Sequence, residues 1–97
     1  ECFQLYERKY RVHAIQRMIQ RDISFTDIDE ASEKLELVEE YPDTTPYPSC
    51  LVLGFTDKKR PLHIVFAANH EAGIAYIITV YEPESTKWSE DFKRRNK

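Results

Sequence analysis

The sequence predicts a single α+β domain over residues 1–97: two N-terminal helices, an antiparallel meander sheet of three to four strands, and a short C-terminal helix. Three observations predict this order. Apolar residues recur with a helical period as far as about residue 35, and they then alternate with a period of two. Short polar turns separate the last apolar runs, which favours antiparallel neighbours. A composition with 41% apolar residues can supply the core of one such domain.

The first expected helix covers residues 11–21, after an opening stretch, residues 2–10, that fits a short strand or an arm. Its apolar stripe consists of Val12, Ala14, Ile15, Met18 and Ile19. The other side carries His13, Arg17 and Arg21, each four residues from the next. Because Arg17 and Arg21 are like charges at i and i+4, this row is mildly destabilising by itself.

The second expected helix begins at Ser24, which is a good N-cap. Asp27, three residues later, resembles the acidic partner of a capping box. Its apolar stripe consists of Ile28, Ala31 and Leu35.

Four strands are expected in the rest of the chain, with Leu37 buried in the first of them; they cover residues 35–41, 50–55, 62–68 and 74–81. The segment 42–48 holds three prolines and predicts a stiff, extended loop. One face of the sheet should pack on the helices, and the other should be partly covered. Trp88 and Phe92 stand four residues apart after Pro83, and this spacing predicts the short C-terminal helix.

The formal net charge of −3 conceals an uneven distribution. Basic residues gather near the N-terminus, whereas residues 22–43 hold nine acidic residues and one lysine. Two interpretations remain open: a local basic binding patch, or a basic helix that forms salt bridges with the acidic one. No apolar run is long enough for a membrane span, and no signal peptide is recognisable. We therefore expect a cytoplasmic protein without membrane contact, in which Cys2 and Cys50 are reduced thiols rather than a disulfide.

The common catalytic and metal-binding motifs are missing from the sequence. It has no GxGxxG, no Walker loop, no CxxC and no HExxH. His13, His63 and His70 fall on different elements, so we expect no metal and no cofactor. A dyad of Cys50 with a histidine is conceivable, but Cys50 opens a strand, where small buried residues are common.

His63 is a stronger candidate, because it alternates with apolar neighbours on its strand. The short preceding turn predicts that it lies roughly opposite Gly54, and the following turn brings it near Val80, Tyr81 or Glu82. A histidine, a tyrosine and a carboxylate would then cluster at one end of the sheet. The alternative is a half-exposed polar pair between neighbouring strands.

Three segments of the sequence resemble a bacterial and archaeal family of small proteins known as a domain of unknown function: HAxxRMxxR, YPxxxPYPSCLxLG and ITVYEP. The resemblance covers about residues 10–95. The wider family is similar to the RelE and ParE toxins, which join N-terminal helices to an antiparallel meander. Many RelE relatives cleave messenger RNA without a metal, whereas ParE relatives act on gyrase. The resemblance therefore implies a RelE-like fold and possible action on RNA.

On the ribonuclease side, the resemblance implies catalytic roles for His13, Arg17, His63 and Tyr81. Cleavage by the 2′-hydroxyl needs an acid, a base and cations for the phosphate. The expected RNA-binding residues are Arg11, Arg21, Lys58, Lys59 and Arg60. RNA and an antitoxin, or another protein, are the expected partners. The alternatives are a non-catalytic protein-interaction module with the same fold and a regulatory protein. The sequence predicts no oligomeric state.

Overall fold

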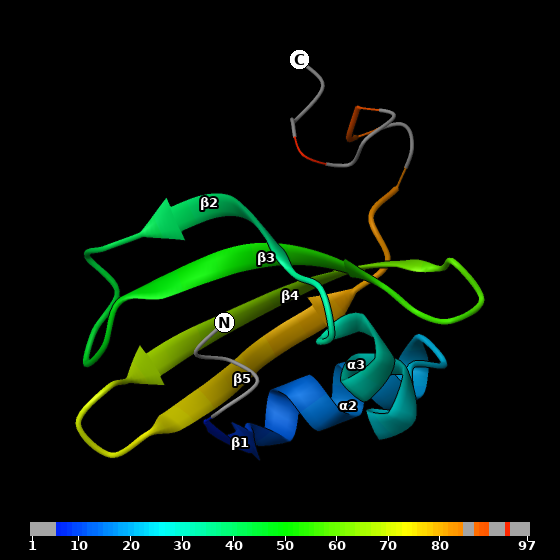
Figure 1. Ribbon diagram of the computed structural model, residues 1–97. Coiled ribbons are helices and arrows are strands. Elements are labelled where there is room, and N and C mark those ends of the chain that lie inside the picture. Colours follow the sequence, from blue (N-terminus) through cyan, green and yellow to red (C-terminus); the bar gives the residue numbers. More distant parts are fainter. Residues whose placement is uncertain (1–5, 85–86, 90–92, 94–97) are drawn as a thin grey trace.

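The computed structural model describes residues 6–84, 87–89 and 93 and consists mainly of one twisted sheet with two short helices (Figure 1). The sheet has five strands in the spatial order β1-β5-β4-β3-β2. Its elements follow the chain as β1 (Glu7–Tyr10), α2 (Val12–Gln20), α3 (Phe25–Ala31), β2 (Glu36–Tyr41), β3 (Ser49–Phe55), β4 (Pro61–Asn69) and β5 (Ile74–Tyr81). Within the described residues, neither helix is long and apolar enough to cross a membrane.

The expected RelE-like meander is wrong, because β1 adds a parallel strand to the sheet. Strands β2 to β5 pair antiparallel, as the short turns predict. However, β1 pairs with β5 in parallel, from Glu7 with Ile74 to Tyr10 with Ile77. A parallel pair requires a long connection, and here the two helices and three strands provide it. The sheet is therefore mixed, and with little helix the fold is only partly α+β.

The expected C-terminal helix is also wrong. Trp88 makes an isolated β-bridge, and none of the described residues after Tyr81 is helical. Its expected partner, Phe92, lies outside the described residues. Trp88 is nevertheless buried, with 4% of its surface exposed. Trp88 is buried beside a turn rather than in a helix, because the Lys87 and Trp88 N–H groups both donate to the Glu84 carbonyl oxygen at 3.0 Å.

Helix α2 buries a narrower stripe than its sequence predicts. Ala14 and Met18 are buried, and Ile15 is half-buried. Val12 and Ile19 are 69% and 76% exposed. Helix α2 packs against β5 on one face of the sheet, so only the side chains that point at β5 are shielded from water.

The start of α3 is as predicted. Ser24 Oγ accepts a hydrogen bond from the Asp27 N–H, and the Asp27 carboxylate accepts one from the Ser24 N–H, both at 3.0 Å. Before this capping box, Asp22 has a left-handed backbone with φ of 56°, which ends α2. Ile23 then turns into the core. The two helices therefore form a corner on one side of the sheet (Figure 1).

The main core lies between this helical corner and the sheet. Its sheet residues include Val52, Leu62, Ile64, Phe66, Ile77 and Val80. Gly54 permits the close approach of α3, because a Cβ there would overlap the carbonyl oxygen of Ala31. The opposite face of the sheet buries Leu51, Leu53 and His63. Both faces are thus covered in part, as expected.

Leu37 is 56% exposed, contrary to its expected burial. A β-bulge between Leu37 and Glu39 shifts the register of β2 on β3. Because an extra residue reverses the alternation of faces, a period of two cannot identify the buried residues across it.

Candidate functional site

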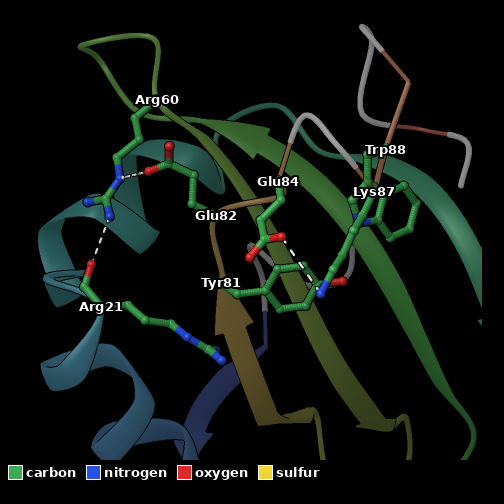
Figure 2. A pocket seen from close by; sticks show the side chains of 7 residues that line it. All are labelled: Arg21, Arg60, Tyr81, Glu82, Glu84, Lys87 and Trp88. Carbon is green, nitrogen blue, oxygen red and sulfur yellow. Dashed lines mark hydrogen bonds and ion pairs between the residues drawn. The ribbon is translucent and has the colours of Figure 1, made fainter. Parts of the chain in front are cut away.

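A pocket of about 520 Å³ opens at the C-terminal end of β5 (Figure 2). Its walls come from three parts of the chain: the end of α2, the start of β4 and the segment that follows β5. The lining residues are Arg21, Arg60, Tyr81, Glu82, Glu84, Lys87 and Trp88. Three cations and two carboxylates therefore meet beside two aromatic rings.

Arg21 reaches the pocket from the C-terminus of α2. Its Nη1 donates a hydrogen bond of 3.0 Å to the carbonyl oxygen of Val80. Its Cζ lies 5.9 Å from the centroid of the Tyr81 ring, and Figure 2 shows the side chain extended toward that ring. This is a cation–π distance. The contact holds a cation against the Tyr81 ring.

Tyr81 is backed by a buried histidine. His63 pairs with Tyr81 across β4 and β5, and its Nδ1 lies 3.2 Å from the Tyr81 hydroxyl oxygen. Its ring also meets Trp88 edge-on, with centroids 4.4 Å apart and planes at 90°. His63 has no exposed surface, so it can act on a bound molecule only through pocket residues that it contacts, such as Tyr81 and Trp88.

The predicted pairing of His63 was right on one side and one residue off on the other. Tyr81 is its partner on β5, but Leu53, not Gly54, is its partner on β3. The half-exposed pair that we weighed against a site is also wrong in its exposure, because the ring is fully buried. On the β5 side the short turn limits the register to a few residues, and a bulge between Val65 and Phe66 selects Tyr81 rather than Val80.

The remaining charged residues of the pocket form two ion pairs. Arg60 Nε lies 2.6 Å from Glu82 Oε1, and Lys87 Nζ lies 3.7 Å from Glu84 Oε2. The Glu84 and Lys87 side chains are 63% and 73% exposed, so screening by solvent weakens their attraction. These two side chains are accordingly more accessible to solvent than Arg60 and Glu82.

His13 and Arg17 lie outside the pocket. Both are exposed on α2, and neither side chain makes a hydrogen bond or ion pair with the part of the chain that the structure describes. The acidic side chains of α3 do not contact His13 or Arg17. Asp27 faces Arg60 at 3.6 Å, and Glu30 accepts a hydrogen bond from the Asp57 N–H. Of the three residues in the expected row, His13, Arg17 and Arg21, only Arg21 lines the pocket.

The other predicted binding residues are also dispersed. Lys58 and Lys59 are exposed on the turn before β4 and do not line the pocket. The Arg11 guanidinium lies 6.0 Å from the centroid of the Tyr76 ring. His70, one of the three histidines that a metal site would need, instead lies with its Nδ1 2.7 Å from the Tyr6 hydroxyl. Among the described residues, no three His, Cys, Asp or Glu side chains gather as metal ligands would.

Sequence reasoning missed the pocket residues beyond Tyr81, namely Glu84, Lys87 and Trp88. Trp88 was predicted only as part of a short C-terminal helix. Pro83, two residues after the end of β5, was the available signal, since a proline cannot continue the strand ladder. Cys50 is half-buried in β3 and packs against the core, while Cys2 lies outside the described residues. Their reduced state stays a prediction.

Comparison with known proteins identifies a family but no characterised relative. The family model described as "Domain of unknown function (DUF4258)" matches residues 10–82. No curated protein and no solved structure matches the chain. The matched range contains both helices, strands β2 to β5 and the pocket residues from Arg21 to Glu82. Since it covers well over half of the sequence, the chain belongs to the DUF4258 family.

Proposed function

We propose that this protein is a metal-independent endoribonuclease of the toxin–antitoxin type, with the pocket at the end of β5 as its active site. One observation carries the proposal: Arg21 lies against Tyr81, whose hydroxyl is held by the buried His63. A cation against the ring and a hydrogen-bonded hydroxyl on the same side chain offer a binding group and a proton donor for a phosphodiester. The reaction class comes from the likeness of the wider family to RelE-type toxins that the sequence implies, while the mixed sheet departs from the RelE-like meander.

The proposed reaction is attack of a ribose 2′-hydroxyl on the neighbouring phosphorus. The P–O5′ bond breaks, giving a 2′,3′-cyclic phosphate and a 5′-hydroxyl. Arg21 binds the phosphate and stabilises the negative charge of the transition state. Tyr81 donates a proton to the leaving oxygen, and His63 orients its hydroxyl. Glu84, the more exposed carboxylate of the pocket, is our candidate to accept the 2′-hydroxyl proton.

Among the residues that line the pocket, basic side chains outnumber acidic ones by one, and Arg21 is the cation that lies against the Tyr81 ring. Arg21, Arg60 and Lys87 outnumber Glu82 and Glu84, although the whole chain carries a formal charge of −3. Local concentration of one sign is what attracts a charged ligand to a cleft. In this proposal His13 and Arg17 take no part in the reaction itself, since neither lines the pocket.

The test uses the purified chain and a fluorescent single-stranded RNA, with Tyr81→Phe and Arg21→Gln as variants. Tyr81→Phe should reduce cleavage by about 100-fold or more while leaving RNA binding largely intact, because only the proton donor is lost. Arg21→Gln should weaken both binding and cleavage. Lys34→Gln, a change at an exposed lysine outside the pocket, serves as the control.

A substrate with a 2′-deoxy sugar at the cleaved position should remain intact, because the nucleophile is missing. In bacteria, induced wild-type protein should arrest growth and fragment RNA, and Tyr81→Phe should do neither. Intact RNA with the wild type, or a fully active Tyr81→Phe, would overturn the proposal.

A non-catalytic protein-interaction module is the second candidate, and the exposure of Val12 and Ile19 favours it. These side chains lie seven residues apart, so they share one side of α2. Exposed apolar groups on one helix side are typical of protein contacts. This candidate predicts harmless expression, intact RNA and no effect of Arg21→Gln on growth.

A further inference from the structure

Arg60 lines the pocket, but its guanidinium is committed to other parts of the protein. We propose that Arg60 is a positioning residue: it fixes the end of α2 and Glu82 so that Arg21 meets Tyr81. Its effect on RNA rests on the proposed function, whereas its effect on α2 does not. This role differs from the direct RNA contact that the sequence predicts for Arg60.

The first observation concerns the end of α2. Arg60 Nη1 donates to the carbonyl oxygen of Asp22 at 2.8 Å, and Nη2 donates to that of Arg21 at 2.9 Å. The last carbonyls of a helix have no partner within the helix, and the helix dipole makes this end negative. A guanidinium can donate hydrogen bonds to two neighbouring carbonyl oxygens from two of its nitrogens, and its positive charge is attracted to the negative end of the helix.

The second observation concerns the acidic side chains around Arg60. Its Nε donates to Glu82 at 2.6 Å, and Asp27 of the α3 capping box lies 3.6 Å from its Nη1. Arg60 thus joins the end of α2, the start of α3 and the segment after β5. Two carboxylates also offset its charge, which lowers its attraction for a phosphate.

The third observation is that the backbone of Arg60 is itself held. Its N–H donates to Thr56 Oγ1 at 3.1 Å, and its carbonyl accepts from the Thr56 N–H at 3.0 Å. Thr56 is 5% exposed. The side chain therefore extends from a fixed turn, and Figure 2 shows it directed at Glu82 and at the backbone of Arg21.

These contacts locate Arg21 at both ends. Arg60 holds its carbonyl oxygen, and Val80 accepts a hydrogen bond from its guanidinium. If Arg60 is removed, the end of α2 loses two charge-assisted hydrogen bonds, and the Arg21 side chain loses its fixed origin. Arg60 would then influence RNA only through Arg21.

A double-mutant cycle on RNA affinity tests this dependence. Arg60→Gln and Arg21→Gln should each weaken binding of the single-stranded RNA by about tenfold, the effect of losing one good charged contact. The double variant should bind no more weakly than Arg21→Gln alone. A direct phosphate contact would instead make the two losses multiply, which would overturn the proposal.

Arg60→Lys separates charge from geometry. Lysine keeps the positive charge but cannot bind two carbonyls and a carboxylate as a planar fork does. A positioning role therefore predicts that Arg60→Lys binds RNA as weakly as Arg60→Gln. Retention of wild-type affinity by Arg60→Lys would overturn it. Lys34→Gln is again the matched control.

Amide hydrogen exchange without RNA keeps this inference independent of the proposed function. The Ile23 N–H bonds to the Met18 carbonyl at 2.9 Å at the end of α2. Its exchange should be about tenfold faster in Arg60→Gln and unchanged in Lys34→Gln. Unchanged exchange in Arg60→Gln overturns the positioning role. If the wild type does not bind RNA, the proposed function fails, and this exchange rate alone decides the role of Arg60.

Discussion

The outer face of α2 and the pocket at the end of β5 carry the same types of residue in different surroundings. His13 and Arg17 are exposed on α2. In the pocket, His63 is buried behind Tyr81, and Arg21 is bound to Val80 and lies against the Tyr81 ring. Residue type alone therefore does not distinguish a site from a solvated surface. The contacts that hold each side chain do.

The helix geometry explains why one row divides between these two regions. Each step of four residues turns the helix by about 40° beyond a full circle. From His13 to Arg21 the direction has thus changed by about 80°. Arg21 reaches the border of the buried face, near the line of Ala14 and Met18, while His13 remains on the solvent side.

The two histidines should show the largest difference. His63→Ala should lower the free energy of unfolding by about 2–4 kcal/mol, because it leaves a cavity between Tyr81 and Trp88. His13→Ala should change it by less than about 0.5 kcal/mol, as is usual at an exposed position. Urea denaturation followed by tryptophan fluorescence and circular dichroism measures both. Equal losses in the two variants would contradict the contrast between the regions.

The two arginines should show a smaller difference in the same direction. Arg21→Gln removes a hydrogen bond to a carbonyl and a contact with Tyr81, for which we expect about 1 kcal/mol. Arg17→Gln should cost less than about 0.5 kcal/mol. Thermal unfolding in low salt measures the pair. If Arg17→Gln proves as costly as Arg21→Gln, the row acts as one unit after all.

Much of this architecture could be predicted from local patterns. The Ser24 capping box, the helix break at Asp22 and the three strands β3 to β5 each depend on residues close together in sequence. The antiparallel pairing of β4 with β5 also follows from a short turn, although the bulge between Val65 and Phe66 decides that His63 faces Tyr81 rather than Val80. Such features are predictable because each is determined within a few residues.

The errors concern contacts between distant segments. β1 was ambiguous because its four residues, ERKY, are polar, and its partner lies more than 60 residues away. The stripe of α2 was too wide because hydropathy does not show how much of the sheet a helix covers. Trp88 and Phe92 have a helical spacing, but Trp88 contacts His63 from an isolated β-bridge that follows a turn. The pocket, which needs three separate segments, was correspondingly only partly predicted.

The side of the sheet beneath α2 also holds a residue whose ionisation affects stability. Tyr10, at the end of β1, packs against the core and meets Phe25 edge-on, with ring centroids 4.8 Å apart. Burial raises the pKa of Tyr10 above its ordinary value of 10.0; Arg8 opposes this rise, and Asp29 adds slightly to it. The folded protein therefore holds the Tyr10 proton more tightly than the unfolded chain does.

The smallest predicted effect follows from this difference. Stability from the protonated Tyr10 is fully present below about pH 10 and is lost as the pH rises through the pKa in the folded state. Urea denaturation at pH 8 and at about pH 11 should show a larger loss for the wild type than for Tyr10→Phe, whose ring cannot ionise. If both proteins lose the same stability, ionisation of Tyr10 does not contribute. The region beneath α2 would then influence stability through packing alone, unlike the hydrogen-bonded His63–Tyr81 pair.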